Sequence, residues 1–178
     1  MRQPRTRRRT ASFNGRSTSS LEPAAPAGYM AVEHPRPAKA DLVLVLKAPR
    51  RLLLLRGPSV LRDYEVSLGT SPLGPKRHWL DGRTPEGRYT VDARVVDSRF
   101  HRALHISYPN ANDLEFARRA GLDPGGNIMI HGLPDGESWV GTAHRQYDWT
   151  NGCIAVTDDE MNEIWELVDD GTPIEIRP

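Results

Sequence analysis

This chain has little cysteine, no long apolar run and almost no net charge. It has 178 residues and a single cysteine, Cys153, so it cannot form an internal disulfide. Cysteine usage therefore leaves the redox compartment open. The longest apolar runs, at residues 42–46 and 52–55, are too short to cross a bilayer. The formal net charge of +1 provides no overall field that would attract nucleic acid, so we expect no nucleic-acid partner.

The first 40 residues differ in composition from the rest of the chain. Residues 1–16 carry six arginines and no acid, and the stretch to residue 40 has almost no large apolar side chains. Such a segment cannot bury enough surface to offset its ordering entropy, so we expect residues 1–40 to be a disordered basic tail. The tail is either simply solvated or contacts an anionic polymer or membrane surface. No apolar core of seven or more residues follows the basic start, so no signal peptide is expected in this chain.

Residues 41–178 have the pattern of a mainly β domain. Two Leu/Val runs, at 42–46 and 52–55, flank Lys-Ala-Pro-Arg and predict a hairpin. Residues 88–95 alternate apolar with polar side chains, as in a half-buried antiparallel strand. The count of short strands predicts a β-sandwich or partly open barrel with two peripheral helices. Further strands are expected near residues 64–68, 104–108, 127–131 and 173–177.

Two helices are expected, each marked by polar capping residues. Asn112 or Asp113 is expected to cap the first, which ends at Gly121. Thr157 starts the second with a Thr-Asp-Asp-Glu capping box. Apolar side chains then recur at helical spacing until Gly171. Long polar connections lie at residues 70–87, 109–126 and 133–151, and loops of that length in a small domain usually carry function.

Cys153 is a candidate nucleophile and His131 a candidate base. Cys153 follows Asn151-Gly152, a turn dipeptide that would place the thiol at the mouth of a strand rather than in its middle. The amides around Gly152 and Cys153 could donate to an oxyanion. His131 ends an apolar run, and a base near a thiol lowers its pKa and later protonates the leaving group. His144 is the second choice of base. A buried, inert cysteine and a core histidine are the alternatives.

Metal and cofactor sites are not indicated by the sequence. His101 and His105 would share a strand face, but no Asp, Glu or Cys cluster stands at ligand spacing near them. Gly125-Gly126 precedes a predicted strand instead of a helix, so it lacks the context of a phosphate-binding loop. We therefore expect no metal and no organic cofactor.

The residues around the candidate pair resemble a known family. His131-Gly132 followed by Thr-Asn-Gly-Cys-Ile at residues 150–154 is similar to the signature of the YkuD-type L,D-transpeptidases. Asp-Gly-Arg-Thr-Pro-Glu-Gly at residues 81–87 also resembles a segment of that family, and Gly-Gly-Asn-Ile-Met-Ile before His131 is similar to its YafK-like branch. The resemblance covers about residues 41–178 and implies a YkuD-like catalytic domain.

Two positions depart from the common pattern of the family. Asn151 stands where many members have a second histidine, and Ala155 stands where many have arginine. Both substitutions resemble the YafK-like branch. They leave open which side chains hold the carboxylate of the substrate that donates the acyl group. Arg145 is our first choice, with Arg83 and Arg99 as alternatives, and the other expected substrate-binding residues are Gly132, His144, Thr150 and Asn151.

The resemblance implies a function in the bacterial cell wall. The Cys153 thiolate would attack a peptidoglycan stem tetrapeptide at its third residue and release D-alanine. The acyl group would then pass to an amine, giving a 3–3 cross-link or anchoring an envelope protein. A cysteine carboxypeptidase or endopeptidase and a non-catalytic peptidoglycan-binding module are the alternatives. The resemblance also implies a periplasmic or envelope location and carbapenem sensitivity, and we expect a monomer.

Overall fold

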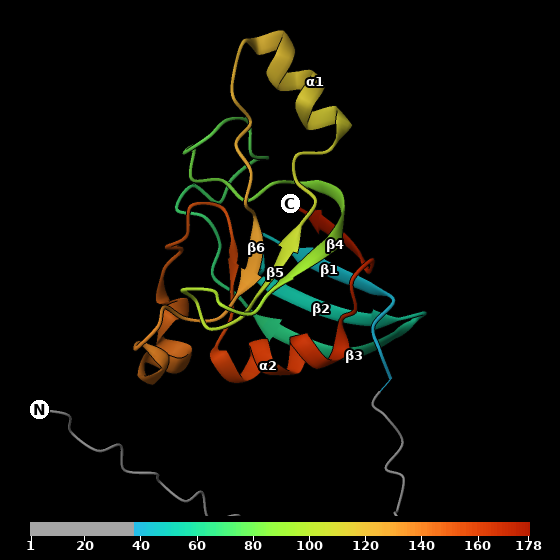
Figure 1. Cartoon of the computed structure of the whole chain (residues 1–178), viewed down its shortest axis with the longest axis vertical. Coiled ribbons are helices and arrows are strands. Elements are labelled where there is room, and N and C mark those ends of the chain that lie inside the picture. Colours follow the sequence, from blue (N-terminus) through green and yellow to red (C-terminus); the bar gives the residue numbers. More distant parts are fainter. Residues whose placement is uncertain (1–37) are drawn as a thin grey trace, which may run out of the picture. The chain divides into compact units, whose positions relative to one another are not determined.

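The computed structural model of the protein describes residues 38–178, and Figure 1 shows its arrangement. The prediction of a disordered tail falls almost wholly outside these residues. The described part begins with chain that is already attached to the domain, because the Ala40 N–H donates to the Leu167 carbonyl at 2.8 Å. Lys39 also pairs with Asp169 at 2.9 Å. The folded domain therefore starts slightly before residue 41.

Eight strands form a single curled sheet, as the prediction of a mainly β, partly open barrel requires (Figure 1). Its strand order is β3-β2-β1-β8-β4-β5-β6-β7, so the last strand of the chain lies in the middle of the sheet. The strands are β1 (Leu42–Leu46), β2 (Arg51–Arg56), β3 (Ser59–Glu65), β4 (Gly87–Val95), β5 (Ala103–Ile106), β6 (Met129–His131), β7 (Ile154–Ala155) and β8 (Pro173–Arg177).

The predicted hairpin of β1 and β2 is confirmed, but one detail of the prediction for β4 is wrong. Leu46 pairs with Arg51 at the closed end of the hairpin, with Arg50 in the turn at a φ of 53°. In β4 the predicted alternation holds through Tyr89 and Val91, which are buried, but Ala93 is exposed. The register against β5 shifts between Val91 and Ala93, and such a bulge re-aims the side chains that follow it.

Both predicted helices are present, and a third was not predicted. Helix α1 (Ala111–Ala120) is capped by Asn110, two residues earlier than Asn112, and ends at Gly121 in the left-handed conformation. Helix α2 (Asp158–Leu167) has the predicted capping box of Thr157 and Glu160. The unpredicted element is η1 (Ser138–Gln146), a 3₁₀ segment within the connection of residues 133–151. Its kink at Gly141 and its polar composition hide it from helical periodicity.

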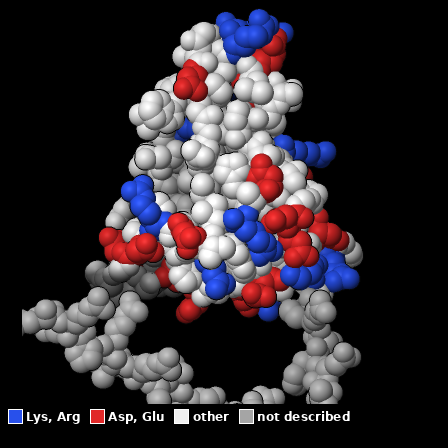
Figure 2. Space-filling view, viewed as in Figure 1, with Lys and Arg blue, Asp and Glu red and all other residues white. Residues whose placement is uncertain are grey.

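The core lies between the curled sheet and α2, whereas α1 extends away from the sheet (Figure 1). Met161, Ile164 and Val168 at α2 have no exposed surface, so this helix packs its apolar stripe on the strands. Charged side chains of both signs are interspersed around the base of the face seen in Figure 2 and at the tip of α1. Across residues 38–178, every helix is too short or too polar to span a bilayer.

Candidate active site

The candidate nucleophile and base leave two neighbouring strands on the same face of the sheet. β6 and β7 are parallel, with Ile130 opposite Ile154 and His131 opposite Ala155. Side chains alternate along a strand, so Cys153, two residues before Ala155, projects to the same face as His131. Ile130 and Ile154 project to the other face and are fully buried in the core. The sheet register therefore brings together two residues that are 22 positions apart in the chain.

The turn that carries Cys153 is held by Thr150. The Thr150 hydroxyl donates to the Cys153 carbonyl at 2.8 Å and accepts from the Gly152 N–H at 3.1 Å. The Thr150 backbone is itself anchored to Leu68, whose carbonyl accepts from the Thr150 N–H at 3.1 Å. Gly152 has a φ of 121°, a conformation that side-chain-bearing residues rarely adopt. The turn thus fixes the direction in which the thiol leaves the backbone.

His131 is buried and its tautomer is set by the backbone. Its Nδ1 lies 2.7 Å from the Gly132 carbonyl, which can only accept, so Nδ1 carries the proton and Nε2 is left as a base. Phe100 packs on the imidazole with ring centroids 4.5 Å apart, and Trp149 meets it edge-on at 5.7 Å. Burial lowers the pKa of His131, although the hydrogen bond to Gly132 acts in the opposite direction.

The surroundings of the Cys153 thiol favour its neutral form. Burial raises the pKa of Cys153, whereas the backbone at Met129 and the charge of Lys76 act to lower it. The thiol donates to the Asn127 carbonyl at 3.6 Å. A raised thiol pKa and a lowered imidazole pKa both favour the uncharged pair at neutral pH. The arrangement therefore suits general-base chemistry, in which the proton leaves sulfur as sulfur attacks.

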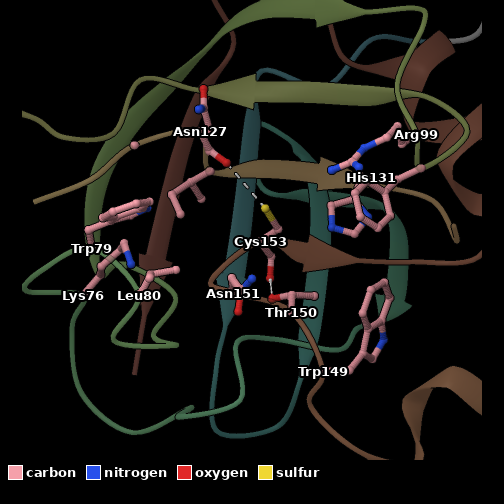
Figure 3. A pocket seen from close by; sticks show the side chains of 13 residues that line it. Lys76, Trp79, Leu80, Arg99, Asn127, His131, Trp149, Thr150, Asn151 and Cys153 are labelled. Carbon is pink, nitrogen blue, oxygen red and sulfur yellow. Dashed lines mark hydrogen bonds between the residues drawn. The ribbon is translucent and has the colours of Figure 1, made fainter.

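Both side chains face one pocket of about 520 Å³ (Figure 3). That volume is in the range of small-molecule and peptide-end sites. The charged side chains that line it are Lys76 and Arg99, and no carboxylate among residues 38–178 does so. The other lining residues include the aromatic side chains of Trp79, Phe100 and Trp149, together with Asn127, Thr150 and Asn151. The pocket is thus suited to an anionic, partly apolar ligand.

Arg145 and His144, both predicted to bind substrate, do not line this pocket and have other partners in the structure. Arg145 is bound by the Glu160 carboxylate at 2.5 and 2.6 Å and lies 3.7 Å from Glu65, so its charge is neutralised. His144 is buried, with its Nδ1 3.2 Å from Ser67 Oγ and 3.5 Å from Trp149 Nε1. Arg145 was our first choice because it is close to Cys153 in sequence. The connection of residues 133–151 folds back on α2 and β3, however, and takes Arg145 to their acidic side chains.

Of three other expected site residues, Gly132 and Gly152 have different surroundings from those anticipated, whereas Asn151 lies at the pocket. Gly132 is buried behind His131, and its carbonyl orients the imidazole instead of facing the pocket. The Gly152 N–H already donates to the Thr150 hydroxyl, so it is not free to donate to a ligand as the sequence suggested. Asn151 is exposed and lines the pocket, and its binding of substrate stays a prediction.

The two histidines considered as a metal pair have separate partners. His101 Nε2 is 2.9 Å from Asn162 Oδ1, and His105 Nδ1 is 2.5 Å from Asp92. The part of the chain that the structure describes contains no group of three or more His, Cys, Asp or Glu residues placed to hold a metal ion.

Sequence reasoning missed Lys76, Trp79, Phe100 and Trp149, which all line the pocket. They lie in connections whose path is set by tertiary contacts, so neither periodicity nor spacing indicated them. Trp149 could have been found, because it directly precedes the Thr-Asn-Gly-Cys turn. Arg99, named only as an alternative to Arg145, is the arginine that the structure brings to the pocket.

A curled, mainly β sheet thus brings a cysteine and a histidine to one pocket beside two adjacent parallel strands. Comparison with known proteins identifies the family. The YkuD family, described as an L,D-transpeptidase catalytic domain, matches residues 40–176, and the chain belongs to it. YafK of Escherichia coli (strain K12) is 32% identical over 112 residues, which are 61% of this chain and 37% of YafK.

Solved structures share the fold. The helical cell shape determining protein Pgp2 of Campylobacter jejuni aligns with a TM-score of 0.56 and 24% identity, over 76% of this chain and 46% of Pgp2. An Enterococcus faecium L,D-transpeptidase, solved as a C442S mutant, aligns with a TM-score of 0.51 and 15% identity, over 79% of this chain and 50% of that one. The chain thus spans less than half the length of YafK and Pgp2.

Proposed function

We propose that the protein is a peptidoglycan L,D-transpeptidase with Cys153 as nucleophile and His131 as base. The single observation that supports this most is the β6–β7 register, which directs both side chains to one face and into one pocket. The fixed tautomer of His131 adds to it, because Nε2 is left unprotonated. An inert core cysteine would not require a base, an anchored turn and a cationic pocket around it.

The proposed reaction proceeds in two transfers. His131 Nε2 takes the thiol proton while Cys153 Sγ attacks the carbonyl carbon between the third residue of the stem and the terminal D-alanine. The Cys153 N–H donates to the resulting oxyanion. The C–N bond then breaks, His131 returns the proton to the departing amine, and a thioester remains on Cys153. An acceptor amine attacks the thioester and loses its proton to His131; the C–S bond then breaks, the acyl group leaves on the acceptor, and His131 returns the proton to the Cys153 sulfur.

Arg99 is the proposed holder of the donor carboxylate. It is exposed, and no carboxylate among residues 38–178 lines the pocket with it. Arginine binds carboxylates through a planar, two-pronged set of N–H donors. In Figure 3 its side chain lies on the His131 side of the pocket. A stem peptide bound there would present its carboxylate near the base.

Intact mass spectrometry after exposure to a carbapenem tests the nucleophile. Since Cys153 is the only cysteine, a single covalent adduct on the wild-type chain and none on Cys153→Ala is the expected result. His131→Gln should acylate about 100- to 10,000-fold more slowly, the range ascribed to a positioned general base. An unmodified wild-type chain, or an adduct that persists in Cys153→Ala, contradicts the proposal.

The acceptor is identified by incubating the protein with a stem tetrapeptide, with and without a second D-amino acid. Exchange of the terminal residue supports transfer to amines. Tripeptide as the only product means that water is the acceptor and the protein is an L,D-carboxypeptidase with the same nucleophile. We further propose that the protein works in the bacterial envelope, where peptidoglycan is found, and that an envelope protein could serve as the acceptor.

A further inference from the structure

Two buried lysines hold the segment of residues 74–87, which contains the motif Asp-Gly-Arg-Thr-Pro-Glu-Gly. Lys76 pairs with Asp81 at 2.8 Å, and these side chains are only 2% and 5% exposed. Lys47 pairs with Glu86 at 2.8 Å, with exposures of 3% and 17%. Burying an ion pair costs desolvation energy that the attraction barely offsets, so such pairs are weak devices for stability alone. Lys76 lines the pocket that holds Cys153, whereas Lys47 does not, and this difference suggests that the two ion pairs have different roles.

The Asp81 carboxylate accepts four hydrogen bonds. Its carboxylate accepts from the backbone N–H groups of Arg77, His78 and Arg83 at 2.7, 3.2 and 3.1 Å, as well as from Lys76. These bonds lower the pKa of Asp81 to about 2, against the opposing effect of its burial. Asp81 therefore carries a permanent negative charge that holds the Lys76 ammonium in one place.

The two members of this ion pair differ in their relation to the pocket. Lys76 is one of the residues that line the pocket with Cys153, and Asp81 is not. In the view of Figure 3, Cys153 lies between Lys76 on one side and His131 on the other. The pair thus places its positive member, and not its negative one, in the wall of the cavity in which sulfur must become negative.

We propose that Lys76 is a positioning residue for the reaction of Cys153: its ammonium, fixed by Asp81, stabilises the negative charge that sulfur and the oxyanion acquire. This inference rests on the proposed role of Cys153 as nucleophile. Charge compensation from the pocket wall is needed because the resting thiol and imidazole are both neutral and partly or wholly buried. The titratable or charged groups that face the thiol from the pocket walls are Lys76, His131 and Arg99.

Lys47 provides a matched control. It is buried to the same degree as Lys76, pairs with an acid of the same segment, and also donates to the carbonyls of Gly74 and Thr84 at 2.6 and 2.9 Å. It does not line the pocket that holds Cys153. Lys47→Met therefore removes a buried ion pair from the same segment without removing a charge from the site.

The test is the pH dependence of Cys153 alkylation by iodoacetamide, a reaction that needs the thiolate but no substrate binding. Lys76→Met should raise the apparent pKa of the thiol and slow alkylation at pH 7 about tenfold, which corresponds to one pKa unit. Lys76→Arg should retain the wild-type profile, since it retains the charge. Asp81→Asn should lower the thiol pKa, because it frees the positive charge of Lys76 from its partner.

A purely structural role predicts a different pattern. In that case Lys76→Met and Asp81→Asn would shift the profile in the same direction, and Lys47→Met would shift it as well. Any of these outcomes, or an unchanged profile in Lys76→Met, overturns the proposal. If Lys76→Met fails to fold, the double variant Lys76→Met/Asp81→Asn removes the uncompensated carboxylate and should still show the raised pKa. The proposed role of Cys153 as nucleophile is tested separately: if it is wrong, the wild-type protein forms no carbapenem adduct.

Discussion

Gly152 and Arg83 are in direct backbone contact: a Cβ placed on Gly152 would lie 2.5 Å from the Arg83 carbonyl oxygen. The segment of residues 81–87 thus presses against the turn that carries the nucleophile. This contact explains why glycine precedes Cys153, since the position requires both a φ of 121° and the absence of a side chain. It also links the Lys76–Asp81 pair mechanically to the site.

Gly152→Ala should disable the site through this contact. The backbone must move to relieve the collision, and a displacement of about 1 Å at the nucleophile can cost about 100-fold in rate. The measurement is the rate of carbapenem adduct formation, with the melting temperature followed in parallel. Gly136→Ala is the matched control, because Gly136 has a φ of 82° but would place its Cβ more than 4 Å from any neighbour. An equal loss in both variants would contradict the role of the contact.

Arg99→Gln should raise KM for a tetrapeptide stem about tenfold or more, because a charge-assisted hydrogen bond to the substrate carboxylate is lost. Its melting temperature should be unchanged, since Arg99 is exposed. Arg145→Gln should behave in the opposite way, lowering the melting temperature because the Glu160 carboxylate loses its partner, with KM unchanged. Steady-state kinetics and thermal denaturation of both variants distinguish the two arginines. A raised KM in Arg145→Gln alone would restore the original expectation from the sequence.

Thr157→Ala should lower the free energy of unfolding by about 1 kcal/mol. The Thr157 side chain accepts from the Glu160 N–H at the start of α2, and loss of such a cap typically costs that amount. Thr157→Ser keeps the hydroxyl and should restore most of the stability, as urea denaturation would show. The rate of Cys153 acylation per folded molecule should not change, and a large change would mean that α2 also positions the nucleophile.

The protein should lose stability as pH falls from about 6.5 towards 4. Burial, with help from the charge of Arg145, lowers the pKa of His144 from 6.5 to about 4. In that pH range the unfolded chain binds a proton that the folded chain excludes, so acid favours unfolding, by at most about 3 kcal/mol. His131 acts in the same direction, because burial lowers its pKa also. His144→Asn should flatten the pH dependence of the melting temperature, whereas His78→Asn, at an exposed site, should not.

Elements whose signals are local could be predicted from the sequence. The hairpin of β1 and β2 and the capping box at Thr157 depend on neighbouring residues, and both are confirmed. Cys153 and His131 could be named because strand ends and turn residues mark them. The lining of the pocket could not, because Lys76 and Arg99 reach it through long-range packing of loops. The bulge in β4 and the pairing of Arg145 with Glu160 were hidden for the same reason.

Because β6 pairs with β7, the relative position of His131 and Cys153 does not depend on the length of the chain between them. His131 and Cys153 are held in place by strand hydrogen bonding, so the connection between Gly132, whose carbonyl orients the imidazole, and Trp149, which packs on it, can change in length and sequence without moving either side chain. That connection contains η1 and ends in Trp149 at the pocket wall. Substrate preference can therefore be altered by grafting this loop from relatives, while the nucleophile and the base stay where the sheet holds them.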